Sequence, residues 1–365
     1  MRVGIDAHMV GGRETGNESY VRGLVDALIA IDSADLDLVV YHLGRPWMAA
    51  SPRVGFRRLG TGAPIWRLAL ELPFRSARDR LDLLHVTYAT PLWSRARLVV
   101  TVHDISFASH PEWFSARDLR VLSTFVPRSL RSAAHVITVS EWERARIIER
   151  YGVPENMISA IHNGPGAAAR PISAADAKAE LKALGMGDFG PYVLAVGNLQ
   201  PRKNLIRLMQ AFEASRARNS DLRLVIAGPS HHRGGEVMEA AVPLGIRVHF
   251  TGYITDRQLA ACYSSCAAFV FPSLYEAFGL PVIEAMAQGV PVACSSAGAL
   301  PEVCGDAALM FDPLSTEAMA GAIHTITNDS AVRDRLAAAG PVRARQFSWE
   351  KSAAITYSTY QKALS

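Results

Sequence analysis

The chain has 365 residues, of which 49% are hydrophobic and 20% charged, and a formal net charge of +4 at pH 7. This length suits two domains of about 150–200 residues, and no apolar run reaches the ~18 residues that a membrane-spanning helix needs. The excess charge lies in residues 1–170, which hold 21 Arg, no Lys and 17 acidic residues, and it is too small to predict nucleic-acid binding.

The cysteines form neither a disulfide framework nor an obvious metal site. Cys262, Cys266, Cys294 and Cys304 are too few and too clustered for a disulfide-rich fold. Cys262 and Cys266 could share a helix face, but no histidine or second cysteine pair accompanies them, so buried thiols are favoured. Because the first residues do not resemble a signal peptide, we expect a cytoplasmic protein with reduced thiols.

The first half of the chain alternates short apolar runs with longer helical stretches, which predicts a parallel sheet covered on both faces. The expected strands are 2–6, 36–41, 83–86, 98–102 and 135–138, and the expected helices are 18–31, 65–80, 116–131 and 141–151. A loop containing Gly11, Gly12, Gly16 and Asn17 separates the first strand from the first helix. Its glycines would permit a ligand to approach the backbone closely; a plain mobile loop is the alternative.

The pattern restarts after a stretch of small residues that ends at Pro171 and is typical of a linker. The expected strands are then 192–196, 222–227, 247–251, 267–270 and 291–294, with helices at 205–215, 234–242, 256–264 and 279–287. We therefore predict an α/β fold of two Rossmann-like, doubly wound parallel-sheet domains that face a cleft. Residues 1–170 form the first domain, residues 171–347 the second, and a helix in residues 348–365 packs back on the first.

Residues that directly follow strands are the best candidates for binding, because ligands of such sheets bind at the carboxyl ends of the strands. Asn198, Arg202 and Lys203 lie between the strand 192–196 and a helix, where two cations and free N–H groups could clamp a diphosphate. A solvated basic turn is the alternative. Gly252 and Tyr253 follow the strand 247–251 and could admit a flat base against the backbone, although a tight turn explains them equally well.

Two glutamates, Glu276 and Glu284, lie near the start of the predicted helix 279–287. Gly279 opens this helix with Pro281 in its first turn, and N–H groups from Phe278 to Leu280 could hold a phosphate. Glu276, in the loop before the helix, would face a sugar. Glu284, about one and a half turns inside, could accept hydrogen bonds from a ribose. The alternative is simple charge matching to the helix dipole, worth ~0.3–1 kcal/mol.

This segment, with its glutamates eight positions apart, resembles the donor-site motif of the retaining family 4 glycosyltransferases, which have the GT-B fold. Other stretches are similar to the family's successive strands and turns and fall in its order: 15–16, 103–106, 139–141, 162–164, 196–204, 224–228, 249–253, 290–295, 301–303 and 347–350. The branch that it resembles most is that of the bacterial mannosyltransferase B-like enzymes, which build surface polysaccharides.

The resemblance implies retaining transfer of a hexose from a nucleotide sugar to a glycan or lipid-linked acceptor. GDP-mannose is the first choice of donor, and UDP- and ADP-sugars stay open. Glu276 would contact the sugar, Glu284 the ribose, and Arg202 with Lys203 the diphosphate. Many members have Arg where this chain has Asn198, so the cationic role falls on the other two residues.

His103 matches the family's histidine that leans over the donor sugar. It follows the strand 98–102, at the edge where a ligand-facing group belongs, and Asp104 could orient its ring. A hydrogen-bonded structural histidine is the alternative.

No cofactor or metal is expected. The one D-x-D sequence, Asp35 to Asp37, precedes a strand and so lies at the wrong edge of the sheet. Arg202, Lys203 and a helix N-terminus could neutralise the leaving diphosphate without a cation.

Residues 63–80 mix aromatic and aliphatic residues with four arginines. A basic amphipathic helix of this kind could touch the inner face of the cytoplasmic membrane and meet a lipid-linked acceptor. Pro73 is expected to interrupt it, and helices that cover Rossmann-like sheets have a similar pattern.

Three other functions stay open at this point. A nucleotide-sugar epimerase has a similar architecture, and a non-catalytic nucleotide-sugar-binding protein would use the same residues without turnover. An NAD-dependent oxidoreductase is less favoured, because no G-x-G-x-x-G follows a strand.

Overall fold

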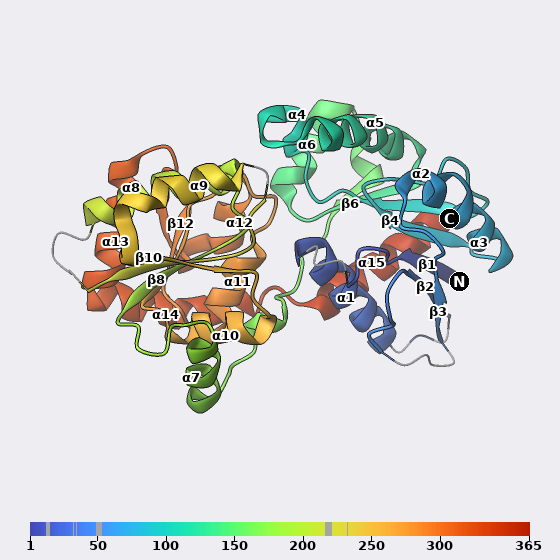
Figure 1. Ribbon diagram of the computed structural model, residues 1–365. Coiled ribbons are helices and arrows are strands. Elements are labelled where there is room, and N and C mark those ends of the chain that lie inside the picture. Colours follow the sequence, from blue (N-terminus) through green and yellow to red (C-terminus); the bar gives the residue numbers. More distant parts are fainter. Residues whose placement is uncertain (12–14, 32, 34, 49–52, 216–220, 232) are drawn as a thin grey trace. The chain divides into compact units, whose positions relative to one another are not determined.

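The computed structural model describes residues 1–11, 15–31, 33, 35–48, 53–215, 221–231 and 233–365 (Figure 1). The chain divides into two compact units. Unit 1 comprises Met1–Gly164 and Ser348–Ser365, and unit 2 comprises Pro165–Phe347. The C-terminal segment therefore completes the unit that the N-terminal segment begins.

Unit 1 is built on a seven-stranded, parallel sheet with the order β3-β2-β1-β4-β5-β6-β7. Its strands are β1 Arg2–Asp6, β2 Asp37–His42, β3 Val54–Arg58, β4 Leu83–Thr87, β5 Arg97–Thr101, β6 His135–Thr138 and β7 Ile158–Ala160. Neighbouring residues of one strand enter different cores: Val99 packs in one apolar cluster and Val100 in the other. Burial on both faces explains why these strands are continuous apolar runs.

Helices cover both faces of the unit 1 sheet. They are α1 Thr15–Ala30, α2 Pro64–Trp66, the π-helical segment η1 Arg67–Glu71, α3 Leu72–Arg78, α4 Ser106–Ser109, α5 Ala116–Ser132, α6 Glu141–Tyr151 and α15 Trp349–Leu364. Helices α1 and α15 share one core, and η1, α3, α5 and α6 share the other. Ser115 and Ser140 cap α5 and α6 by accepting from the backbone N–H three residues on.

Unit 2 repeats the architecture with a six-stranded parallel sheet of order β10-β9-β8-β11-β12-β13. Its strands are β8 Tyr192–Val196, β9 Arg223–Ala227, β10 Val248–Gly252, β11 Ala268–Phe271, β12 Val292–Ser295 and β13 Leu309–Phe311. Its helices are α7 Ala174–Ala183, α8 Leu205–Ser215, α9 Gly234–Ala241, α10 Asp256–Ser265, α11 Leu280–Ala287, α12 Leu300–Cys304, α13 Thr316–Asn328 and α14 Ser330–Ala344. One core lies under α8, α9 and α13, and the other under α10, α11 and α12.

The predicted fold class, two doubly wound parallel sheets, is confirmed. The edge strands β3 and β7 were not predicted, because β3 reads Val-Gly-Phe-Arg-Arg and β7 has only three residues. The prediction of a loop through Asn17 is wrong: α1 begins at Thr15, so Gly16 and Asn17 lie in its first turn. Gly11 precedes that turn with φ +87°, and Gly12 lies outside the described residues.

The predicted interruption at Pro73 is also wrong. Helical structure runs from Pro64 to Arg78, because the wider π turn places the N–H of Leu72 on the carbonyl oxygen of Arg67. Pro73 then stands in the first turn of α3, where its missing N–H costs little.

Candidate functional site

Glycines at the carboxyl ends of β8, β9 and β10 bring three turns of unit 2 close together. Gly197, Gly228 and Gly252 have φ of +150°, +149° and +66°. The N–H of Gly197 donates to Ala227 at 2.8 Å, and that of Gly228 to Gly252 at 3.0 Å. A Cβ on Gly228 would lie 2.2 Å from the carbonyl oxygen of Gly197, so this close packing of backbone requires glycine.

Glu276 and two cations meet at the same edge of the sheet. Lys203 Nζ lies 2.6 Å from Glu276 Oε1, and Arg202 Nη1 lies 3.6 Å from Oε2. Lys203 and Glu276 are both buried. Burial opposes ionisation of Glu276, but the charges of Lys203 and Arg202 outweigh it and hold the pKa of its carboxyl below the usual range. The site therefore holds a carboxylate and two cations at neutral pH.

Asn204 fixes the turn that carries the cations. Its φ of +56° is in the left-handed region, which Asn tolerates better than most residues. Its amide donates to the carbonyl oxygens of Pro272 at 3.1 Å and Pro313 at 2.8 Å. The N–H of Leu274 donates to Arg202 at 2.9 Å. These bonds join the loops that follow β8, β11 and β13.

The loop from Glu276 to α11 is held by two glycines. Gly279 caps α11 with φ +108°, as predicted for the residue that opens this helix. Gly298 has φ +67°, and a Cβ there would lie 2.4 Å from the carbonyl oxygen of Glu276. Ala299 donates its N–H to that same oxygen at 2.8 Å, so the segment Gly298 to Ala299 holds the backbone of Glu276.

Glu284 is a buried carboxyl with two donors that sequence reasoning missed. Tyr263 Oη donates to its Oε2 at 3.2 Å, and the backbone N–H of Gly166 also donates to it. Burial raises the pKa of Glu284 to about 7, helped by the charge of Asp256 and opposed by the two hydrogen bonds. No local pattern marks Tyr263 or Gly166, because each lies far from Glu284 along the chain.

His103 lies in unit 1, two residues beyond β5. Its ring meets those of Tyr20 and Tyr88 edge-on, with centroids 4.5 and 5.6 Å away. Its Nε2 is buried without a hydrogen-bond partner. Burial lowers the pKa of His103 to about 4, although the charge of Asp104 acts in the opposite direction. The imidazole is therefore neutral at pH 7.

Asp104 does not orient that ring through a hydrogen bond. Its Oδ1 accepts from the N–H and the hydroxyl of Ser106 at 3.0 and 2.6 Å, and Oδ2 accepts from Tyr88 at 3.4 Å. The Asx turn with Ser106 starts α4 and occupies the carboxylate.

A buried ion pair at the carboxyl end of β1 was also missed. Arg67, on the π segment, pairs with Asp6, whose other oxygen accepts from His8 Nδ1 at 3.0 Å. Burial opposes ionisation of Asp6, but the charges of Arg67 and His8 lower its pKa. Arg67 was counted as part of a basic helix surface, whereas its side chain is 6% exposed.

The remaining predicted residues divide between the units. Tyr253 is 47% exposed, while Phe278 is buried with its ring edge-on to Phe347 at 5.5 Å. Asn198 and Leu280 are half-buried in unit 2. The candidate residues Gly11, Gly16, Asn17 and His103 belong to unit 1, and those from Asn198 to Glu284 belong to unit 2.

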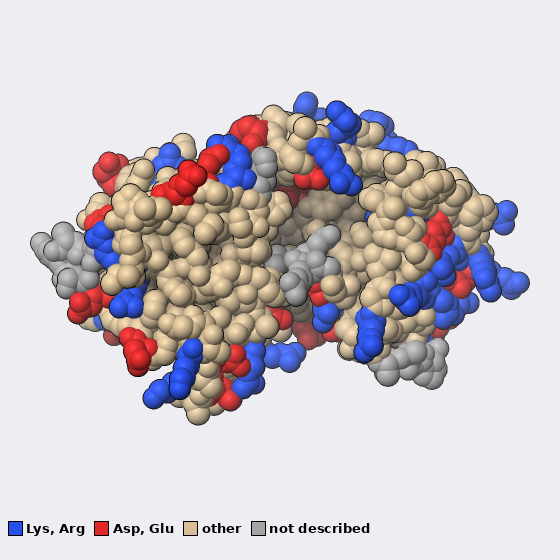
Figure 2. Space-filling model, viewed as in Figure 1, with Lys and Arg blue, Asp and Glu red and all other residues tan. Residues whose placement is uncertain are grey.

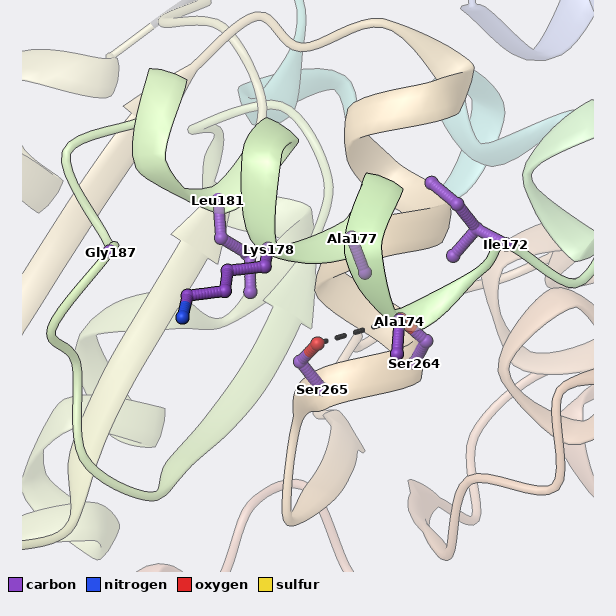
Figure 3. Close-up of a pocket in the computed structure, with 8 residues that line it drawn as sticks. All are labelled: Ile172, Ala174, Ala177, Lys178, Leu181, Gly187, Ser264 and Ser265. Atoms are coloured by element: carbon purple, nitrogen blue, oxygen red, sulfur yellow. Dashed lines mark hydrogen bonds between the residues drawn. The ribbon is translucent and has the colours of Figure 1, made fainter.

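A pocket of about 390 Å³ lies elsewhere in unit 2, between α7 and α10 (Figure 3). Lys178 and Leu181 line it from α7, and Ser264 and Ser265 line it from α10. It shares no residue with the candidate site; the hydroxyls of Ser264 and Ser265 lie 3.5 Å apart, and Lys178 points away from them (Figure 3).

Other sequence predictions have plain outcomes. All four cysteines are free thiols, three buried and Cys266 half-buried. Asp37 is the first residue of β2, so the D-x-D sequence does lie at the amino edge. Across the described part of the chain, no three His, Cys, Asp or Glu side chains gather as metal ligands would. None of the described helices combines the length and the apolar character needed to cross a membrane.

Comparison with known families identifies both halves of the chain. Residues 15–165 match the model of glycosyltransferase family 4, and residues 177–343 match that of the glycosyl transferases group 1. The chain is 35% identical to the O-antigen chain mannosyltransferase B of Escherichia coli over 274 residues, which are 73% of this chain and 70% of that one.

Solved structures share the whole fold. Sucrose-phosphate synthase from Thermosynechococcus elongatus has a TM-score of 0.77 at 24% identity, covering 99% of this chain and 98% of its own. HepE of Anabaena, in complex with UDP-glucose, has a TM-score of 0.75 at 20% identity and covers 99% of both chains. The two family models and the Escherichia coli relative, rather than the shared fold, favour a glycosyltransferase over the epimerase, oxidoreductase and non-catalytic alternatives.

Proposed function

The chain belongs to the family 4 and group 1 glycosyltransferases, and from that premise we propose that it transfers mannose from GDP-mannose, with retention at the anomeric carbon. The acceptor that we propose is a glycan, free or carried on a lipid at the cytoplasmic face of the membrane, in surface polysaccharide synthesis. The choice of mannose is supported by the Escherichia coli relative, an O-antigen chain mannosyltransferase. The choice of a nucleotide sugar is supported by HepE, which binds UDP-glucose.

One observation carries the assignment of the donor site: Lys203 and Arg202 converge on Glu276 beside the start of α11. Departure of the diphosphate leaves negative charge on its oxygens, and two fixed cations with the N–H groups of a helix start stabilise such charge. The ionised Glu276 then faces the sugar, where a carboxylate stabilises positive charge at the anomeric carbon. In this proposal Glu284 accepts from the ribose, and the neutral His103 of unit 1 contacts the sugar.

A panel of nucleotide sugars tests the donor. A donor present at 100 times its dissociation constant raises the free energy of unfolding by ~2.7 kcal/mol, so GDP-mannose should raise the melting temperature more than GDP alone, UDP-glucose or ADP-glucose. Transfer of radiolabelled mannose to a glycan extract should follow the same preference. A larger shift with UDP- or ADP-sugars, and transfer from them, would reject GDP-mannose while leaving sugar transfer intact.

Glu276 is the residue whose replacement tests the site. Glu276→Gln keeps the volume and removes the charge, and transfer should fall by ~10²–10³-fold, the cost of losing one electrostatic group at a reacting centre. Glu239→Gln, at an exposed position of α9, is the matched control and should keep wild-type activity. The change leaves the buried Lys203 without its carboxylate, which could destabilise the fold. Circular dichroism at the assay temperature therefore checks that the variant is folded. Activity near wild type in Glu276→Gln would reject the assignment.

A further inference from the structure

Large apolar side chains are exposed together on one surface of unit 1. Four come from the helical segment that runs from α2 to α3, and two from the loop between β4 and β5. We call this surface the apolar face, and its members and exposed fractions are Ile65 (70%), Trp66 (62%), Leu70 (43%), Phe74 (61%), Leu92 (49%) and Trp93 (41%). Trp66, Leu70 and Phe74 are each four residues apart and so form one helical stripe.

The two segments of the apolar face are joined to each other. The rings of Phe74 and Trp93 meet edge-on with centroids 5.3 Å apart. The N–H of Leu92 donates to the carbonyl oxygen of Leu68 at 2.9 Å. From α5, the guanidinium of Arg128 donates to the carbonyl oxygens of Pro91 at 3.2 Å and Leu92 at 2.8 Å. These hydrogen bonds hold the loop in a conformation in which Leu92 and Trp93 are exposed.

The buried pair of Arg67 and Asp6 decides which side of the helix faces outward. Arg67 turns inward to Asp6, and Leu68 and Leu72 enter the core beside it. Because these three residues occupy the inner side of the helix, the helical stripe of Trp66, Leu70 and Phe74 lies on its outer side. The exposure of Trp66 and Phe74 is therefore a consequence of the fold and not of a frayed helix.

Charge around the apolar face is one-sided. The Glu71 carboxylate accepts from the N–H groups of Gly60 and Thr61 and pairs with Arg75 at 2.9 Å. Asp79 accepts from Tyr41 at 2.8 Å. By contrast, Arg78, Arg80 and Arg95 are exposed. Figure 2 shows basic groups spread over this part of unit 1 with fewer acidic groups among them.

We propose that the apolar face docks unit 1 on a membrane surface that contains anionic lipids. Tryptophan and phenylalanine can enter the headgroup region while arginines at the rim meet lipid phosphates. A second copy of the chain is a poorer occupant, since a two-fold interface would bring the same exposed arginines of both copies together. This docking does not depend on which donor the enzyme uses.

Co-sedimentation of the full chain with vesicles tests the proposal. The protein should bind vesicles of phosphatidylcholine with 30 mol% phosphatidylglycerol, bind pure phosphatidylcholine much more weakly, and lose binding as salt rises. Arg78→Gln with Arg95→Gln should weaken binding by roughly fivefold per arginine, which corresponds to ~1 kcal/mol each. Binding that is absent, or equal on both kinds of vesicle, overturns the proposal.

Aromatic variants separate docking from folding. Trp66→Ser with Phe74→Ser should reduce vesicle binding by about tenfold or more, because apolar insertion is lost, whereas Trp66→Phe should retain most of it. Val242→Ser with Ile246→Ser removes two apolar side chains that are 76% and 83% exposed in unit 2 and should change nothing. Light scattering without lipid should give the same mass for all variants. If the wild-type chain is instead a dimer, and Trp66→Ser with Phe74→Ser makes it a monomer without loss of vesicle binding, the apolar face binds a second copy and the proposal is overturned.

Discussion

At the residue scale, the two glutamates around α11 differ in protonation because their partners differ. Glu276 faces Lys203 and Arg202 and stays ionised. Glu284, inside α11, accepts from two neutral donors among the described residues, so burial dominates and its pKa is about 7. This difference suits the roles proposed above, in which Glu276 stabilises charge at the sugar and Glu284 accepts hydrogen bonds from the ribose.

Glu284 predicts a dependence on pH. A carboxyl whose pKa rises from 4.5 to about 7 on folding adds stability below pH 4.5, and that stability is lost as pH rises to about 7. Glu284→Gln lacks this effect, so its melting temperature relative to wild type should increase between pH 5 and 7.5 and then level off. Donor binding to wild type should tighten over the same interval, because the carboxylate is the better acceptor. A constant difference between the two melting curves would contradict the assigned pKa.

Gly166 gives a second residue-scale prediction. A Cβ there would lie 2.3 Å from Glu284 Oε1, so Gly166→Ala should displace that carboxyl and weaken donor binding by roughly tenfold, or ~1.4 kcal/mol. Gly321→Ala is the control, since no atom lies within 4 Å of its added Cβ in α13. It should stabilise the fold by ~0.5–1 kcal/mol without changing the donor dissociation constant. Equal donor affinity in both variants would show that Gly166 has no role in placing Glu284.

At the scale of elements, α15 is joined to the unit 1 sheet by a buried polar chain. Tyr360 Oη lies 2.7 Å from His85 Nδ1, and His85 Nε2 lies 2.7 Å from Thr101 Oγ1, which meets Tyr20 Oη at 2.8 Å. Burial, with a contribution from His103, lowers the pKa of His85 to about 3, so the ring is neutral and bonds on both sides. These hydrogen bonds join α1, β4, β5 and α15.

Removing the Tyr360 hydroxyl tests that connection. Tyr360→Phe leaves a ring nitrogen of His85 buried without a partner and should cost ~1–3 kcal/mol of unfolding free energy in urea. Tyr357→Phe, on the same helix, removes a hydroxyl that lies 2.9 Å from Ser33 Oγ at a half-buried position. It should cost less than ~1 kcal/mol. An equal loss in the two variants would show that the buried chain adds nothing beyond ordinary packing.

At the scale of the whole molecule, each unit supplies a different part of the proposed chemistry. Unit 2 holds the cations, Glu276 and Glu284, and unit 1 holds His103 and the apolar face. In the proposed donor site, the two fixed cations beside α11 would take the role that a divalent ion has in other phosphate sites. We therefore propose that transfer uses residues of both units, and we expect it to need no added metal.

A chelator tests the absence of a metal requirement. Transfer by enzyme treated with excess EDTA and dialysed should stay within about twofold of the untreated rate, since Arg202 and Lys203 neutralise the leaving group. EDTA presaturated with magnesium controls for effects of the chelator itself. Loss of transfer that magnesium restores would contradict the prediction and reassign part of the charge stabilisation to the ion.

The architecture and the segments that follow the strands could be predicted from the amino-acid sequence. Helices α6 and α8 and strands β1, β6 and β8 have the predicted bounds, because a strand buried on both faces must be apolar and a helix beside it must be amphipathic. Contacts between distant residues could not be predicted in this way: Gly166 and Tyr263 with Glu284, Arg67 with Asp6, and Arg128 with Leu92. These pairs are distant along the chain, so local periodicity carries no trace of them, and burial shifts a pKa only once the surrounding groups are in place.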